Sequence, residues 1–377
     1  MAENTITAIV PDIYEALDVV SRELTGFIPS VTMNASAERA GDGQSIVVDV
    51  EPAGNVADIT PAMTVPDPTG QTSGSTTISI SKSRAANFGF IGSDQKKLNT
   101  GPGYPSVRAQ KIAQAIRSVV NEVETDLGAL HATASRAAGT AGTTPFATAN
   151  DYTAASLGLK ILKDNGGGND SQFVMSTASG ANLIGKQSAV NAAGTDSILR
   201  QGVLLDVAGM PLRESAQIVD FTKGTGASYL VNDASAAVGD TAIAADGGSG
   251  TILAGDVITI AGDSNQYVVT AALSAGSLTI AAPGPRVAVA DNAAITVVAT
   301  SSRNMVFDRS ALVLAARAPA RPEEGDTASD VIVITDPRSG LSLEFAMYKG
   351  YRKVRYEVGL AWGVKNIKPE HTALVLG

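Results

Sequence analysis

The sequence predicts an α+β fold, and three kinds of segment carry that prediction. An amphipathic pattern between Ser106 and Ala137 indicates one long helix. Strand-like sequence lies on both sides of it, and a Gly-rich run of short β segments occupies 226–300. At 377 residues the chain exceeds what one hydrophobic core usually holds, so we expect about two or three sub-domains.

The long helix is predicted from a stripe of apolar residues at steps of three and four. The stripe contains Ile112, Ile116, Val119, Val123, Leu127, Leu130 and Ala134. Tyr104-Pro105 marks its start and Gly139 its end. At 1.5 Å per residue the helix would be about 50 Å long. A helix of this length suits a structural element against which other parts of the molecule pack.

The charges on this helix run against the preference of the helix dipole. Basic residues occupy its first half and acidic residues its second half, whereas the dipole favours the reverse. We therefore hypothesise that some of these charges pair with another segment or with another subunit. The candidate inter-subunit contacts are Arg108, Lys111, Arg117, Glu122, Glu124 and Asp126. The alternative is a chance arrangement on a solvated face.

The region ahead of the helix is expected to be extended. A short helix at Val10–Leu24 begins at Pro11, and its apolar face has no local partner. Gln44–Val50 and Thr76–Ile91 are the two arms of a predicted hairpin with a Pro- and Gly-rich tip. A hairpin with so few large apolar residues cannot build its own core, so it either projects into solvent or lies across another molecule, and we favour the second.

The region after the helix mixes helices and strands. The predicted elements are a helix at Ala149–Asp164, a strand at Ser171–Ser176, a helix at Ala181–Gln187, and a strand, turn and strand within Gly202–Ser215. Four β runs follow at Asp256–Ile260, Tyr267–Ala271, Leu278–Ala281 and Ile295–Val298. Their spacing predicts a small antiparallel barrel or sandwich, which looks inserted. Alternation from Val354 to Val364 predicts a long final strand.

Composition excludes several classes of protein. The chain has no Cys, so disulfides and thiolate metal sites are absent. Its net charge of −9 argues against a protein that coats nucleic acid. It holds no apolar stretch long enough to span a bilayer. The first residues lack a basic leader, which argues against a signal peptide and favours a cytoplasmic site of synthesis.

Motifs for catalysis or metal binding are weak, so we predict neither an enzyme nor a metal or cofactor site. His131 and His371 have no ligand-spaced partner, and packing or surface roles are expected. Gly180–Gln187 (GANLIGKQ) matches GxxxxGK, but Gln187 stands where a magnesium-binding hydroxyl is needed. We interpret it as an ordinary helix rather than a nucleotide-binding loop.

Two charged stretches have plain interpretations. Glu323, Glu324 and Asp326 lie in a Pro-rich loop without a basic or His partner, so we expect a solvated loop rather than a paired-carboxylate site. In YKGYRKVRYE, strand alternation places Lys353 and Arg355 on a wet face. Direct nucleic-acid contact by that stretch is the alternative.

The order of these parts resembles the major capsid proteins of tailed double-stranded DNA phages, which share the Hong Kong ninety-seven fold. Within them it looks most like the coat proteins of the Salmonella short-tailed phage type, which carry an inserted β-barrel. The residues that carry the resemblance are QSIVVDVEPAGN, SVRAQKIAQAIRSVVNEVETDLGAL, GVLLDVAGMPLRES, RSALVLAARAPA and GLAWGVKNIKPEHTALVLG.

The resemblance implies a division of the chain into named parts. These would be an N-terminal arm at 1–42, an extended loop at 43–100, the spine helix and peripheral domain at 101–175, an axial domain at 176–225 and 301–345, an inserted β-domain at 226–300, and a return strand to the peripheral domain at 346–377. Because the chain starts directly at the arm, a separate scaffolding protein would be implied. Some relatives cross-link Lys to Asn; Lys82, Lys96 and Lys97 lie in the loop region, but no catalytic Glu is identified.

The function implied is a shell protein that assembles as hexamers and pentamers into an icosahedral capsid. Its partners would be itself, a scaffolding protein, a portal, a decoration protein and packaged DNA held without sequence specificity, in a virion assembled in the host cytoplasm. No membrane is involved. An encapsulin-like bacterial compartment shell and a secreted β-rich surface or adhesin protein remain as alternatives.

Overall fold

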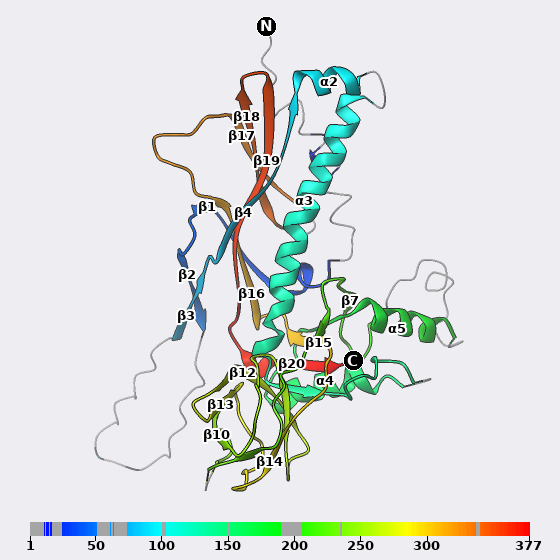
Figure 1. Ribbon diagram of the computed structural model, residues 1–377, viewed down its shortest axis with the longest axis vertical. Coiled ribbons are helices and arrows are strands. Elements are labelled where there is room, and N and C mark those ends of the chain that lie inside the picture. The colour runs from blue at the N-terminus through cyan, green and yellow to red at the C-terminus, as the bar shows by residue number, and fades with distance from the viewer. Residues whose placement is uncertain are drawn as a thin grey trace.

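The computed structural model describes residues 25–50, 74–99, 103–148, 151–189, 206–233, 236–336 and 340–377, together with residues 11, 13, 14, 16, 61 and 63. The α+β class is confirmed. The molecule is elongated: the long helix α3 lies along a tall sheet, while a second sheet and a small barrel form the opposite end (Figure 1).

The long helix is shorter than its sequence pattern predicts. α3 spans Tyr104–Ala129, begins with Pro105 in its first turn, and is followed by a 3₁₀ turn at Leu130–Thr133. The expected continuation to Ala137 is wrong, because β5 (Arg136–Ala138) pairs with the strand β20 (Thr372–Leu376) instead. At 1.5 Å per residue α3 is about 39 Å long. Its buried face follows the predicted stripe, with Glu124 included.

The tall sheet is built around the predicted final strand. This strand, β19 (Lys353–Asn366), is the longest in the described part of the chain. It pairs with β4 (Lys82–Ile91), β16 (Leu312–Pro319) and β18 (Ser342–Gly350). β1 (Thr32–Ala40) pairs with β16, and β17 (Ala328–Thr335) pairs with β18. Lys353 and Arg355 are exposed as expected, whereas 358–363 is buried on both faces.

The predicted hairpin exists, but its second arm is divided in two. β2 (Ser45–Val50) pairs with β3 (Gly74–Ser79) in a separate two-stranded sheet. The rest of that arm is β4, which pairs with β19 over ten positions and therefore belongs to the tall sheet. The hairpin forms no core of its own. Ile78 and Ile80 at its base are buried against Ala40, Val313, Ala315 and Ala361 of the tall sheet. The hairpin tip, 51–73, lies outside the described residues save Pro61 and Met63.

The Gly-rich region forms a closed antiparallel β-barrel with its own core. A barrel was one of the two architectures that the sequence predicted, the other being a sandwich. Its six strands are β9 (Tyr229–Val231), β10 (Ala242–Asp246), β11 (Val257–Ile260), β12 (Gln266–Ser274), β13 (Ser277–Ile280) and β14 (Ala294–Val297). Pairing between β11 and β12 closes the ring. The sequence missed β9 and β10, since YLV and AIAAD are too short or too Ala-rich to show a clear alternation.

The second sheet joins the barrel to the rest of the molecule. Beside the barrel it contains β5, β6 (Ser171–Met175), β7 (Leu212–Glu214), β8 (Asp220–Phe221), β15 (Ser301–Asp308) and β20 (Thr372–Leu376). The expected helices are present as α4 (Thr153–Asp164) and α5 (Thr177–Ala189). α4 packs on β15 and β20. Gly209 makes the expected turn, with φ +76°. Of the strand expected ahead of this turn, 202–205 lie outside the described residues, and Val207 forms only an isolated bridge with Met210.

Two further expectations meet the structure only in part. The helix expected at Val10–Leu24 falls outside the described residues, apart from helical positions 11, 13, 14 and 16, of which Ile13 and Ala16 are buried. The boundary expected between 345 and 346 falls inside β18, because β17, β18 and β19 pair in succession.

Candidate assembly site around the long helix

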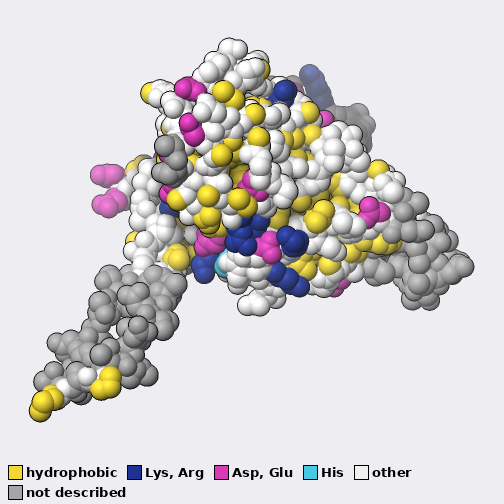
Figure 2. Space-filling model, turned by 90° about the horizontal axis from the view of Figure 1, so that it is seen from below, with side chains coloured by type: hydrophobic (Ala, Val, Ile, Leu, Met, Phe, Trp, Pro, Cys, Tyr) yellow, Lys and Arg dark blue, Asp and Glu magenta, His cyan; other side chains and the backbone are white. Residues whose placement is uncertain are grey.

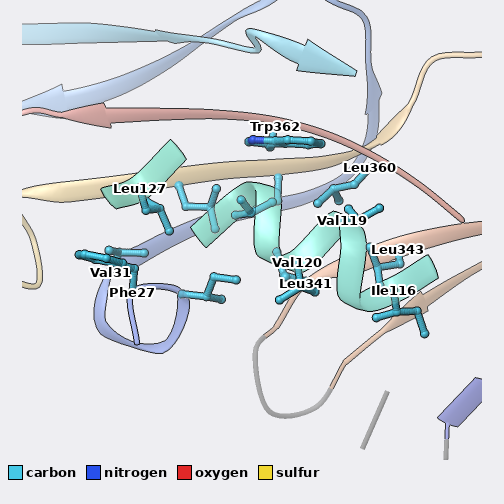
Figure 3. Packing of buried hydrophobic residues seen from close by; sticks show 14 of the residues in the cluster. Phe27, Val31, Ile116, Val119, Val120, Leu127, Leu341, Leu343, Leu360 and Trp362 are labelled. Carbon is cyan, nitrogen blue, oxygen red and sulfur yellow. The ribbon is translucent and has the colours of Figure 1, made fainter. Parts of the chain in front are cut away.

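The long helix is the place where segments far apart in the sequence meet. Apolar side chains from three regions surround it: Phe27 and Val31 near Leu127, Trp362 and Leu360 on another side, and Leu341 and Leu343 towards Ile116 (Figure 3). Each is almost fully buried. The helix therefore fixes the chain ahead of β1, the strand β19 and the start of β18 relative to one another.

Glu124 anchors the segment ahead of β1 to the helix. Its carboxylate accepts the backbone N–H groups of Gly26 (3.2 Å), Phe27 (3.1 Å) and Ile28 (2.7 Å) and the hydroxyl of Ser215 (3.0 Å). The residue is 0% exposed. This burial raises the pKa of the carboxyl above its ordinary value, against the hydrogen bonds, which favour the charged form.

Lys82 links the base of the loop region to the helix. Its ammonium group lies 2.7 Å from the Asp126 carboxylate and 3.2 Å from that of Glu122. The hydrogen bond to Asp126 is the main cause that raises the pKa of Lys82. Asp126 also accepts the indole N–H of Trp362 at 2.8 Å, and Arg84 pairs with Glu122 at 2.7 Å. This set of charges, the Lys82 cluster, joins α3, β4 and β19.

The three acidic candidates on the helix thus find their partners in other segments of the same chain. The basic candidates lie nearer the other end: Arg108 over the ring of Tyr104, Lys111 over that of Phe90 at 5.6 Å, and Arg117 donating to Gln114 at 2.7 Å. A contact of any of these six residues with another subunit stays a prediction.

The sequence reasoning missed the partners of these acids. Lys82, Ser215 and Trp362 lie far from α3 in the sequence, so no local pattern connects them with it. One signal was present: Glu122 and Asp126 stand four residues apart, on one face of the helix, beside the apolar stripe.

The β2–β3 hairpin presents one face without a partner among the described residues. Val47 is 60% exposed, while Ile46 and Val48 on the opposite face pack partly against the core at the hairpin base. Lys365 on β19 ties the hairpin to the tall sheet by donating to the Thr76 hydroxyl (2.7 Å) and the Thr77 carbonyl (2.9 Å). β2 pairs only with β3, so its other edge is unpaired within the described chain.

The residues considered for chemistry have structural roles. His131 packs on Phe221 with ring centres 5.2 Å apart, and His371 lies 3.7 Å from Asp308. The GANLIGKQ stretch lies in α5, as interpreted from the sequence. One expectation was wrong: Asp326 does have a basic partner, Arg321, at 2.8 Å, because the chain reverses at Gly325.

The described residues contain no group of three or more His, Asp and Glu side chains arranged to hold a metal ion. None of the helices described is both long and apolar enough to cross a membrane. Seen from below, Lys and Arg side chains gather near the centre of the molecule with acidic side chains beside them, so this face has no single sign of charge (Figure 2).

Comparison with known proteins found likeness in fold alone. No protein-family model matches the sequence, and no curated protein matches it. Similar solved structures include the capsid of the cyanophage P-SCSP1u, at 12% identity and TM-score 0.48, covering 93% of this chain and 88% of that one. The virus-like particle from Pyrococcus furiosus is similar at 9% identity and TM-score 0.43, covering 97% and 98%.

A third similar structure, from Mycobacterium phage Che8, has 12% identity and TM-score 0.45 and covers 90% of this chain and 88% of that one. Likeness at this level carries no information about individual residues or ligands. The function has to follow from the geometry of this chain.

Proposed function

We propose that this chain is a major capsid protein that assembles with copies of itself into a closed shell around double-stranded DNA. The observation that carries the proposal is the β2–β3 hairpin, which forms a sheet of its own and leaves Val47 60% exposed. A two-stranded hairpin is at best marginally stable in water, so its exposed face favours a second molecule as partner.

The rest of the fold supports a structural rather than a catalytic role. The long helix and the tall sheet form a rigid axis, and the Lys82 cluster and Glu124 fix the bases of two N-terminal segments on it. Rigid subunits with one projecting segment suit repeated contacts, in which each copy covers apolar surface on the next. The net charge of −9 would keep a shell wall from binding the enclosed DNA tightly.

The finer features of the proposal rest on the resemblance in sequence order. First, the chain forms hexamers and pentamers in an icosahedral lattice. Second, it is divided into arm, loop, peripheral, axial and inserted parts with the boundaries given above. Third, its partners are a scaffolding protein, a portal and a decoration protein. The charged residues on α3 that reach the surface, Arg108, Lys111, Arg117, Glu122 and Asp126, are proposed to contribute to subunit contacts, with exposed Lys111 the most accessible of them. Glu124 is fully buried and holds the chain ahead of β1 instead.

Electron microscopy of the purified chain, with sedimentation velocity, tests this function. We expect shells, tubes or polyheads, and an assembly that is lost in Val47→Asp, because the new charge would enter the contact between copies. Val287→Asp, at a valine 49% exposed in the segment between β13 and β14, is the matched control and should assemble as the wild type does.

A uniform monomer at all concentrations, or equal assembly of both variants, would contradict the proposal. The contents of particles made in a host with the neighbouring genes separate the two kinds of shell. Nuclease-protected DNA supports a capsid, whereas a co-purified enzyme without DNA supports an encapsulin-like compartment.

A further inference from the structure

A small cavity lies between the end of α3, the segment 217–222 and the strand β15. Its volume is about 230 Å³. Gly128, Ala129 and Val219 form apolar walls, while Arg303 and His131 line it from the interior side. Apart from the packing of His131 on Phe221, the contacts described above involve neither of these two polar side chains. We call this cavity the Arg303 pocket.

Arg303 is a buried cation with unused hydrogen-bond donors. The residue is 3% exposed, and Nη1 donates to the Ser301 hydroxyl at 2.7 Å. Nε and Nη2 are buried and have no partner in the described part of the chain. Burial lowers the pKa of Arg303 to about 10, so the group is still charged at neutral pH. A buried, charged guanidinium with unpaired donors is energetically costly, and an anion that accepts hydrogen bonds from it would remove that cost.

The nearest acidic groups do not meet this need. Asp256 attracts Arg303 through space, but its carboxylate accepts the backbone N–H groups of Gly224 (3.0 Å) and Leu253 (2.7 Å). Asp220 lies at the exposed rim, and no hydrogen bond joins it to Arg303. The guanidinium is instead covered by the Phe221 ring, whose centre lies 5.2 Å from Cζ.

His131 adds a hydrogen-bond acceptor to the same pocket. Its Nδ1 lies 3.0 Å from the carbonyl oxygen of Gly128, and because a carbonyl only accepts, Nδ1 must carry the proton. Burial and, less strongly, the charge of Arg303 lower the pKa of His131, which keeps the ring neutral. Nε2 is therefore an acceptor, and it is buried without a partner among the described residues.

A ligand that satisfies both groups must offer anionic oxygens to Arg303 and a hydroxyl proton to His131. Hydrogen phosphate carries both at neutral pH. Sulfate has the same shape but no proton, and a phosphodiester has none either. We propose that the Arg303 pocket binds one hydrogen phosphate ion, with Arg303 donating to its oxygens and His131 Nε2 accepting from its P–OH group. The Phe221 ring has to turn aside for the ion to reach Arg303.

Equilibrium dialysis of the full chain against radiolabelled inorganic phosphate at pH 7 tests this site. The bound label per chain can be measured for free subunits and for assemblies alike, so failure of the capsid proposal would not affect the result. We expect about one phosphate per chain, and displacement by sulfate or dimethyl phosphate at least about tenfold weaker than by unlabelled phosphate.

Variants locate the bound ion. Val219→Glu adds a negative charge at the pocket mouth, where Val219 is 72% exposed, and should weaken binding about tenfold or more through repulsion. Val238→Glu, at a valine 61% exposed outside the pocket, should leave binding unchanged. His131→Phe should abolish the preference for phosphate over sulfate.

Three results would overturn the proposal: no phosphate bound, equal displacement by sulfate, or equal binding by Val219→Glu and the control. The first would mean that interior water satisfies these groups. The rim variant keeps the test decisive if His131→Phe fails to fold.

Discussion

The carboxylate of Glu124, on the buried face of α3 near its C-terminal end, accepts the backbone N–H of Ile28 at 2.7 Å. The two residues are 96 positions apart in the sequence. A charged side chain within an apolar stripe is expensive to bury unless its oxygens are hydrogen-bonded. Here the buried N–H groups of Gly26, Phe27 and Ile28, at and just ahead of the start of the 3₁₀ turn Ile28–Ser30, supply those bonds. The carboxylate and these N–H groups therefore satisfy each other.

Removal of this carboxylate should destabilise the fold strongly. Glu124→Ala leaves the N–H groups of Gly26, Phe27 and Ile28 without their acceptor in a buried place, and we expect a loss of about 3–5 kcal/mol in the free energy of unfolding. Urea denaturation of unassembled chain measures it. Glu122→Ala, on the same helix but partly exposed, is the control and should lose about 1 kcal/mol or less. Similar losses in both variants would show that Glu124 is no anchor.

The stability contributed by Glu124 should depend on pH with a defined sign. Because the folded-state pKa is raised above the ordinary value of 4.5, the folded chain holds this proton more tightly than the unfolded chain does. The contribution is therefore full below pH 4.5 and is lost as the pH rises through the raised pKa. Glu124→Gln does not titrate at this position and serves as the reference. As the pH falls from 7 to about 5, the unfolding free energy of the wild type should increase relative to that of Glu124→Gln. A difference that is constant or moves the other way would refute this assignment.

The ion pair between Lys82 and Asp126 should couple more strongly than an exposed pair. A double-mutant cycle with Lys82→Met and Asp126→Asn should give a coupling energy of about 1 kcal/mol, because the pair is partly shielded and Trp362 orients the carboxylate. The helical pair Lys160 and Asp164, whose lysine is 65% exposed, should give about 0.3–0.5 kcal/mol in the same assay. Equal coupling in both cycles would mean that shielding contributes nothing.

A methyl group at Gly363 should separate the hairpin base from β19. A Cβ built there lies 2.0 Å from the carbonyl oxygen of Ser79, which no backbone adjustment of a few tenths of an ångström relieves. Gly363→Ala should therefore cost about 1–3 kcal/mol in unfolding free energy. It should also make the β2–β3 hairpin more sensitive to limited proteolysis.

Gly92→Ala at the start of α2 (Gly92–Leu98) is the matched control, since a Cβ there meets nothing within 4 Å. It should behave as the wild type in both assays. If Gly363→Ala resists the protease as well as the wild type does, the close approach of β19 and the hairpin base is not what holds the hairpin in place.

Elements with a strong local period were predictable. The stripe on α3 and the alternation in β19 both come from adjacent residues that share one face, so the sequence indicated them within a few positions. Elements whose form depends on a partner were not. Ala134–Ala138 continues the helical pattern, but β20 pairs with part of it and the helix ends early. The break between β3 and β4 likewise follows from pairing with two different strands.

The candidate site divides in the same way. The unusual order of charges on α3 indicated that some of them had distant partners, and Glu122, Glu124 and Asp126 do. Which partners they have could not be derived, because Lys82 and Trp362 are 44 and 236 residues from Asp126. Arg303 carries no signal in the sequence, and His131 has no ligand-spaced partner there, so neither residue indicated the pocket.

By itself, the sequence determined the α+β class, the long helix, the small β domain and the final strand, because hydrophobic period and turn residues are local properties. Only the tertiary structure decided that the barrel closes through β11 and β12, that the second hairpin arm splits between two sheets, and that a buried glutamate holds the chain ahead of β1. Those features depend on contacts between distant segments, where burial removes water and leaves each polar group to find its partner within the fold.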